Sequence, residues 1–323
     1  MRVGLGQFRD PFPEYLAYAA QFGVTDIVMN RANLPVVDGN WQLSDLVKLR
    51  LAVEGYGLKL SALENVPLTM MPDVILGGPR RDEQIENMIA TVRNIARAGI
   101  PIFGYGWNPS QVWRTTPRQI RGGAVATAYD HREVVDYPPV HGREYGEDEM
   151  WVNLDYWIRA ITPVAEEEGI RLGIHPPDPP VDSHGGVFPV LNSYDGYRRL
   201  LGIVDSPANA IEFCQGTISE MRDSADGGIY GFIAEMVSRE RILYVHFRNV
   251  SAPDPESFTE EFINTGYVDM YRALKAYHDG GYSSFFIDDH APHTHGDTDW
   301  GHRGRAFAIG YIQAMIEALA KGG

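Results

Sequence analysis

Short runs of apolar and β-branched residues alternate along this chain with longer segments in which apolar positions recur at helical spacing. The short runs predict eight strands, at residues 3–5, 26–29, 59–63, 102–105, 171–175, 210–213, 242–246 and 284–287. The longer segments predict eight helices, at residues 12–22, 43–56, 82–98, 150–168, 194–203, 229–238, 268–278 and 303–320. Strict alternation of strand and helix is typical of a parallel sheet, and eight repeats predict an α/β fold, the (β/α)8 TIM barrel.

Glycines at four junctions support this interpretation. Gly23, Gly57, Gly99 and Gly169 each stand between a predicted helix and the strand that follows it. Glycine suits the left-handed conformation that commonly ends a helix. An open, doubly wound sheet is the alternative fold, but no G-x-G-x-x-G motif follows the first predicted strand.

Residues 108–149 interrupt this rhythm, because they hold few periodic apolar positions and many Gly, Arg, Tyr and Pro residues. The segment follows the fourth predicted strand, at the face of a barrel that carries active sites. We expect it to form a lid over the barrel mouth or a contact between subunits, with partial disorder as the alternative. With this insertion included, we interpret residues 1–323 as a single TIM-barrel domain.

Composition narrows the class of protein. The 323 residues are 44% hydrophobic and 22% charged, which is ordinary for a globular chain, and no apolar run reaches the length of a membrane span. The net charge of −15 argues against nucleic-acid binding, whereas a small anionic substrate can still be held by local basic groups or a metal. The single cysteine rules out an internal disulfide. We therefore expect a cytoplasmic protein with a small-molecule substrate and no nucleic-acid or membrane partner.

Four side chains of metal-binding type stand at the ends of successive predicted strands: His175, Cys214, His246 and Asp289. They are 39, 32 and 43 residues apart, and each gap fits one βα unit of a barrel that averages roughly 250 residues in eight units. Strand ends meet at one face of a barrel, so the four side chains should converge. A core histidine, a small buried hydrophobe and a helix cap are the ordinary alternatives for each residue alone. Together, imidazole, thiolate and carboxylate indicate a divalent transition-metal site and disfavour Mg²⁺ and Ca²⁺.

The alternation of side chains along a strand adds detail to this site. If Cys214 faces the mouth of the barrel, Glu212 lies one layer below it. Tyr244 likewise lies below His246, and Arg248 reaches above it. Glu212 is therefore a candidate to orient a ligating histidine from outside the ligand shell.

Motifs around these positions resemble those of bacterial D-mannonate dehydratases, a family similar in fold to the xylose-isomerase-like barrels. The set is specific, although any single member is weak, and it covers residues 58–290 in order. The motifs are His175-Pro176-Pro177-Asp178-Pro179-Pro180, Phe213-Cys214-Gln215-Gly216-Thr217, Val245-His246-Phe247-Arg248, Gly266-Tyr267-Val268-Asp269-Met270-Tyr271, Asp288-Asp289-His290, Leu63-Glu64-Asn65-Val66-Pro67 and Val112-Trp113-Arg114-Thr115.

The resemblance implies a metal, a reaction and catalytic residues. The metal is Mn²⁺ in the first instance, with Fe²⁺, Co²⁺ or Zn²⁺ as the other candidates. The reaction is dehydration of a sugar acid, D-mannonate to 2-keto-3-deoxy-D-gluconate, by loss of the C2 proton and the C3 hydroxyl. His290 is implied as the acid–base group, and Arg114 and Arg248 as forks onto the substrate. His302 stands nearest the position of the family's catalytic tyrosine, so we expect it to supply a second proton transfer. We also expect a homo-oligomer.

The chain departs from the family pattern at two further places. Pro177 replaces an acidic residue, and the paired histidines that follow the second strand in the family have no counterpart in residues 30–35. Two alternatives therefore stay open. One is a metal-dependent sugar isomerase or epimerase, supported by Glu64 and Glu212 but opposed by the thiolate of Cys214. The other is a barrel that binds sugar acids without catalysis.

Overall fold

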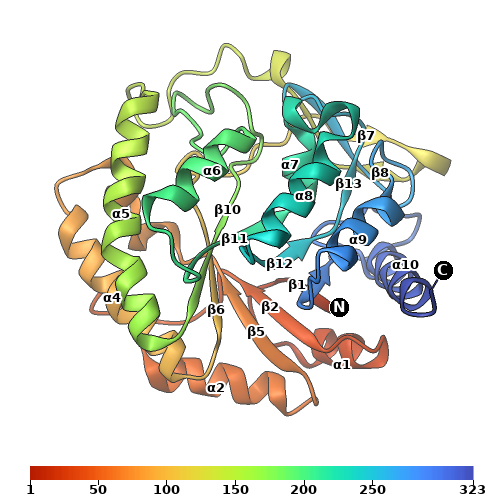
Figure 1. The fold of residues 1–323 in the computed structure, drawn as a ribbon, viewed down its shortest axis with the longest axis horizontal. Coiled ribbons are helices and arrows are strands. Elements are labelled where there is room, and N and C mark those ends of the chain that lie inside the picture. Colours follow the sequence, from red (N-terminus) through yellow and green to blue (C-terminus); the bar gives the residue numbers. More distant parts are fainter. Residues whose placement is uncertain (323) are drawn as a thin grey trace.

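The eight predicted strands close into one parallel barrel in the computed structural model, which describes residues 1–322 (Figure 1). Around the barrel the order is β1 (Arg2–Phe8), β15 (Phe285–Ile287), β12 (Ile242–His246), β11 (Asn209–Cys214), β10 (Arg171–His175), β6 (Ile102–Gly106), β5 (Lys59–Glu64) and β2 (Asp26–Asn30). β1 pairs with β2 on one side and with β15 on the other. This closure confirms the TIM barrel and excludes the open sheet.

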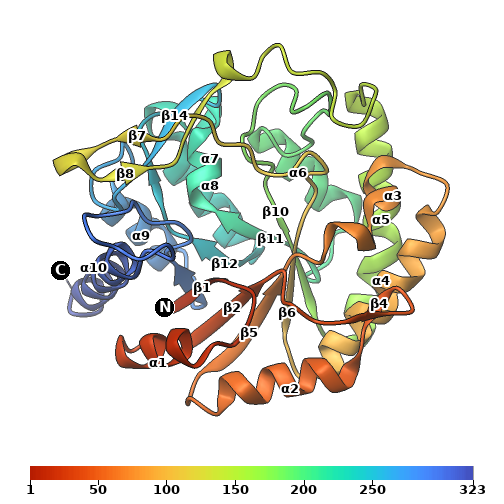
Figure 2. The same ribbon diagram turned by 180° about the vertical axis from the view of Figure 1, so that it is seen from behind.

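The eight predicted helices are present and surround the barrel (Figures 1 and 2). No helix within residues 1–322 has both the length and the apolar character needed to span a membrane. The sequence pattern missed the short helices, since fewer than two turns leave little periodicity to detect. The long helices are α1 (Pro13–Gln21), α2 (Leu43–Glu54), α4 (Arg81–Arg97), α5 (Glu147–Glu168), α6 (Tyr194–Ile203), α8 (Gly228–Ser238), α9 (Met270–Asp279) and α10 (His302–Ala320). The short ones are η1 (Leu68–Met70), α3 (Pro72–Leu76), η2 (Arg121–Gly123), η3 (His131–Glu133), α7 (Gln215–Glu220) and η4 (Arg222–Gly227).

The four glycines expected at helix ends adopt the left-handed conformation. Their φ angles are +69° at Gly23, +73° at Gly57, +80° at Gly99 and +70° at Gly169. These turns end a helix and direct the chain into the next barrel strand, as predicted.

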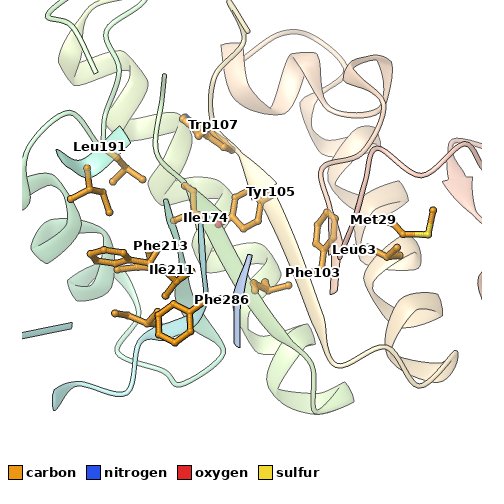
Figure 3. Close-up of a cluster of buried hydrophobic side chains, with 14 of the residues drawn as sticks. Met29, Leu63, Phe103, Tyr105, Trp107, Ile174, Leu191, Ile211, Phe213 and Phe286 are labelled. Carbon is orange, nitrogen blue, oxygen red and sulfur yellow. The ribbon is translucent and has the colours of Figure 1, made fainter. Parts of the chain in front are cut away.

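Apolar side chains fill both faces of the barrel strands. Phe103, Ile174, Phe213 and Phe286 belong to the large cluster of buried side chains that includes residues of the surrounding helices (Figure 3). A second cluster includes Val28, Ala62, Ala210, Leu243, Tyr244, Phe285 and Ile287, all on barrel strands. This packing fixes the strands, so the residues at their carboxyl ends project from a rigid frame.

The segment after β6 contains regular structure. It forms β7 (Arg118–Gln119), β8 (Val125–Ala126) and β9 (Ala128–Asp130) before α5 begins. β9 pairs with β14 (Ser257–Glu261), which also pairs with β13 (Asn249–Val250), so this insertion is joined to the one after β12. The β7–β8 hairpin lies at the edge of the molecule (Figures 1 and 2). A further small hairpin is formed by β3 (Val36–Val37) and β4 (Asn40–Trp41).

Candidate metal centre and active site

An open cavity lies at the carboxyl ends of the barrel strands, the face on which TIM-barrel active sites are built. Its empty space is about 890 Å³ when the solvent-open region at its mouth is included. The segment after β6 contributes Asn108, Gln111 and Val112 to its wall. Polar and charged side chains form much of the remaining wall: Gln7, Asn30, Arg31, Glu64, Asn65, His175, Asp178, His246, Asp289 and His290.

The structure brings the four predicted metal ligands together. Donor atoms of His175, Cys214 and His246 all lie within 4.8 Å of one another. Oδ2 of Asp289 lies 3.4 Å from Nδ1 of His246 and 3.9 Å from the Cys214 sulfur. The convergence expected from strand ends at one face of a barrel is therefore present.

Both histidines are oriented by atoms outside this cluster. Nδ1 of His175 is 2.6 Å from the carbonyl oxygen of Pro176, which leaves Nε2 as the coordinating nitrogen. Nε2 of His246 lies 3.1 Å from a carboxylate oxygen of Glu64 and 3.1 Å from one of Glu212. Nδ1 of His246 is buried without a hydrogen-bond partner and faces Asp289. Two oriented imidazoles, one thiol and one carboxylate, with an unsatisfied nitrogen among them, fit a divalent transition metal.

The pKa shifts within this cluster also fit a divalent cation. Burial opposes ionisation of Cys214, but Arg248 and the two histidines outweigh it and hold the pKa of the thiol well below its ordinary value. Burial also opposes the charged form of His175, yet Glu212 and Cys214 raise the pKa of this imidazole to about 10. Without a metal, protonated imidazoles balance the thiolate. A bound divalent cation would take over that charge and release the protons.

Glu212 occupies the position that strand alternation predicted for it, beneath the ligand layer and against His246. With Glu64 and His246 it forms a second buried group that could hold a metal ion. Burial and the charge of Glu64 raise the pKa of Glu212 well above its ordinary value. Burial acts in the same direction on Glu64, but His246 outweighs it and keeps the pKa of Glu64 below its ordinary value. The two carboxylates therefore favour opposite protonation states around one imidazole.

Arg114 is already bound to protein carboxylates. Its guanidinium makes two hydrogen bonds of 2.7 Å to Asp178 and one of 2.6 Å to Glu260. Its donors are occupied and it does not line the cavity, so the expectation that it binds substrate has no support in these contacts. The inner edge of the segment, Asn108 to Val112, reaches the cavity instead.

Arg248 is buried in the same manner. It donates to Asp178 at 3.0 Å, to Glu220 at 3.1 Å and to Asp289 at 3.0 Å. The position above His246 was expected, and in it the donors of Arg248 are occupied by protein carboxylates, among them Asp289. Both arginines thus belong to one network of buried ion pairs.

His290 lines the cavity next to Asp289 and keeps 40% of its side chain exposed. Its Nδ1 lies 3.1 Å from Glu260, so Nε2 is the nitrogen available to substrate. Burial lowers the pKa of His290, but Asp289 and Glu260 outweigh that effect and raise it above the ordinary value. Asp289 has a φ of +58°, a turn at the strand end that lets these two adjacent side chains both reach the cavity.

The structure does not bring His302 to this cavity. The residue begins α10, and its Nδ1 lies 2.5 Å from Oγ1 of Thr298. Its ring packs against those of Tyr15, Tyr18 and Trp300. Gly301, at φ +81°, turns the chain just before it. The expectation of a second proton transfer from His302 has no support in these contacts.

Sequence reasoning missed a chain of amides across the cavity floor. Gln7 donates to Asp289 at 2.8 Å, Asn30 donates to Gln7 at 2.8 Å, and Asn65 donates to Asn30 at 3.2 Å. Gln7, Asn65 and Asp289 all have positive φ angles, as does Arg31. Strained non-glycine residues of this kind cluster at functional sites. The signal in the sequence for Gln7, Asn30 and Asn65 is their position at or just after strand ends. Amide side chains at strand ends, and not only side chains of metal-binding type, therefore indicate this cavity.

The structure is a closed (β/α)8 barrel with imidazole, thiol and carboxylate groups together at its strand ends, where TIM-barrel enzymes carry their active sites. The sequence model of the family described as D-mannonate dehydratase (UxuA) matches residues 10–141 and 141–322. The chain belongs to this family and is a hydro-lyase.

Relatives and solved structures agree with this assignment. The chain is 30% identical to a mannonate dehydratase of Streptococcus agalactiae, over 87% of this chain and 88% of the relative. It is 30% identical to one of Thermotoga petrophila, over 93% and 92%. The crystal structure of mannonate dehydratase from Streptococcus suis matches with a TM-score of 0.89 and 27% identity, covering 100% of this chain and 94% of that one. An L-ribulose 3-epimerase matches at a TM-score of 0.60 but only 12% identity, so it shows the fold alone and does not favour the isomerase alternative.

Proposed function

We propose that the protein dehydrates D-mannonate to 2-keto-3-deoxy-D-gluconate. The observation that carries this proposal is the position of His290, an acid–base group that lines the cavity with its Nε2 3.6 Å from Asp289, beside His175, Cys214 and His246. The relatives named above are mannonate dehydratases, which supports the choice of substrate. We also propose that the enzyme acts in the cytoplasm, where the thiol of Cys214 stays reduced. The expected homo-oligomer stays a prediction.

We propose Mn²⁺ as the native metal, held by His175, Cys214, His246 and Asp289, with Fe²⁺, Co²⁺ or Zn²⁺ able to take its place. The choice of Mn²⁺ rests on the resemblance to the family, and the donor set is compatible with all four ions. When bound, the ion supplies Lewis-acid stabilisation of the negative charge that develops on the substrate carboxylate. Glu64 and Glu212 keep His246 in place for this role.

In the proposed reaction the chain's own groups move the protons. Nε2 of His290 takes the C2 proton, because Nδ1 is engaged by Glu260. Glu260 stabilises the imidazolium that forms, and this imidazolium can return the proton to the departing C3 hydroxyl, which leaves as water. The resulting enol becomes the 2-keto-3-deoxy acid. Arg248 and Arg114 act as positioning residues, since they hold Asp289, Asp178 and Glu260.

The test is to incubate the metal-loaded protein with a panel of aldonic acids and aldoses and to identify the products. A 2-keto-3-deoxy acid formed from D-mannonate supports the proposal. A new aldose or ketose would show an isomerase, and metal-dependent binding without turnover would show a binding protein. Either of those two results contradicts the proposal.

A further inference from the structure

Arg31 lines the cavity without a partner in the protein. It directly follows β2, and its side chain faces the same space as His175 and His290. Within residues 1–322, no hydrogen bond or ion pair engages its guanidinium, in contrast to Arg114 and Arg248. Burial and the nearby charge of Arg9 place the pKa of Arg31 below its ordinary value, with Glu64 acting in the opposite direction. A half-buried cation without a partner is costly unless a ligand supplies the counter-charge.

The backbone holds Arg31 in this position. Its φ is +49°, which is unusual for a residue other than glycine. Its N–H donates to the carbonyl of Glu64 at 2.7 Å, and its own carbonyl accepts from Nε of Arg9 at 3.2 Å. Strain that is fixed from both sides is characteristic of residues placed for a ligand.

The barrel places Arg31 across the mouth from three of the predicted metal ligands, His175, Cys214 and His246, whereas Asp289 follows β15, two strands from β2. In the strand order, three strands separate β2 from β11 in either direction, so the end of β2 lies opposite Cys214. His175 and His246 stand on the strands that flank β11. A substrate whose C1 carboxylate lies at these side chains therefore directs its other end toward the side of the cavity that holds Arg31.

We propose that Arg31 binds an anionic group at the end of the substrate remote from C1. The preferred substrate is then a sugar acid with a second negative charge at its far end, either a terminal carboxylate, as in an aldarate, or a phosphate ester. This inference rests on the proposed dehydratase function. The far end of D-mannonate is a neutral hydroxymethyl group. D-mannonate can therefore react, but it provides no negative charge opposite the guanidinium of Arg31. Asn30 and Asn65 also line the cavity, but their amides are hydrogen-bonded to each other and to Gln7, which leaves Arg31 as the charged group at this end.

The experiment compares three substrates with the same configuration: D-mannonate, its aldarate D-mannarate, and 6-phospho-D-mannonate. Wild type, Arg31→Lys and Arg31→Gln are assayed for keto-deoxy acid, with Arg80→Gln as the matched control, since Arg80 is an exposed arginine paired with Glu83. We expect wild type to prefer at least one dianionic substrate in kcat/KM by about 10- to 100-fold, the usual worth of a charged hydrogen-bonded contact. Which dianion is preferred distinguishes carboxylate from phosphate.

The variants decide whether Arg31 is responsible. The ratio of dianion to D-mannonate should fall to near one in Arg31→Gln, fall partly in Arg31→Lys, and stay unchanged in Arg80→Gln. A loss of folded protein lowers all three activities by the same factor, so it cannot by itself produce a fall in this ratio. A wild type without preference for either dianion, or a ratio retained in Arg31→Gln, overturns the inference.

Calorimetric titration with D-mannarate and 6-phospho-D-mannonate separates this inference from the proposed function. If wild type does not convert D-mannonate, the proposed function fails. Binding of either dianion that weakens by about 10-fold or more in Arg31→Gln still supports the anion site. Equal binding of both dianions to wild type and Arg31→Gln, or no binding to either, contradicts it.

Discussion

A carboxylate oxygen of Glu260 lies 3.1 Å from Nδ1 of His290. The same carboxylate accepts a 2.6 Å hydrogen bond from Arg114, so one acidic residue links the proposed acid–base group to a buried arginine. This contact fixes the ring of His290 and leaves Nε2 toward the cavity.

Replacing His290 should therefore affect turnover and not metal binding. We expect His290→Asn to lower kcat by about 10²-fold or more while the metal content stays at the wild-type level. His302→Phe should stay within a few-fold of wild type, because His302 packs against Tyr15, Tyr18 and Trp300 outside the cavity. Steady-state kinetics with elemental analysis checks both. A large loss of kcat in His302→Phe would restore the proton-transfer role that the sequence suggested.

Removing a ligand from the metal cluster should remove the metal. Loss of a partner outside the ligand shell typically weakens metal binding by about 10- to 100-fold, and loss of a ligand should exceed this. We expect Cys214→Ser and His246→Ala to have little metal after dialysis, whereas the exposed His278→Ala keeps it. Elemental analysis is the measurement. Full occupancy in both ligand variants would rule out the assigned cluster.

Arg114 should contribute strongly to stability. Arg114→Met leaves Asp178 and Glu260 as buried carboxylates without their shared cation, and we expect a loss of about 3–5 kcal/mol in the free energy of unfolding. Arg118→Met is the control, because its ion pair with Asp130 is partly exposed and should be worth about 1 kcal/mol or less. Urea unfolding measures both. Equal losses in the two variants would show that the buried network is not the cause.

His184 should make stability fall in mild acid. Burial lowers the pKa of this imidazole in the folded protein to about 4, below its ordinary value of 6.5. Below pH 6.5 the unfolded chain takes up a proton that the folded one excludes, so stability present above pH 6.5 is lost as the pH falls toward 4. Between pH 7.5 and 5 this loss should be about 2 kcal/mol.

His184→Gln isolates that contribution, since other acidic groups titrate alike in both proteins. Urea unfolding at the two pH values should show a smaller decrease in the variant than in wild type. The same decrease in both would mean that His184 is protonated in the folded state or is not responsible.

The fold and the centre of the site could be predicted because they depend on local patterns. Apolar runs marked the eight barrel strands, and the strand ends placed Cys214 near His175, His246 and Asp289 without knowledge of any long-range contact. Alternation along a strand was enough to place Glu212 beneath His246. In each case a period along the chain determines the direction of a side chain.

The rest depended on contacts between segments that are distant in the sequence. Arg114 looked available for substrate because its partner Glu260 lies on β14, which belongs to another insertion. The position of His302 after the last strand predicted a catalytic role. The turn at Gly301 instead directs the His302 ring toward the aromatic side chains of α1. Arg31 gave no signal, since an arginine after a strand is ordinarily solvated.

The pairing of β9 with β14 couples two insertions that arise from different strands of the barrel. Neither insertion can change its length or register freely, because Tyr129 must still meet Phe258. The segment that lines the cavity at Asn108, Gln111 and Val112 is the same one that continues into β9. An attempt to transfer substrate preference between relatives by exchanging the segment after β6 alone would therefore separate it from its strand partner. Such an exchange should succeed only when both insertions, with β9 and β14, are taken together from the same relative.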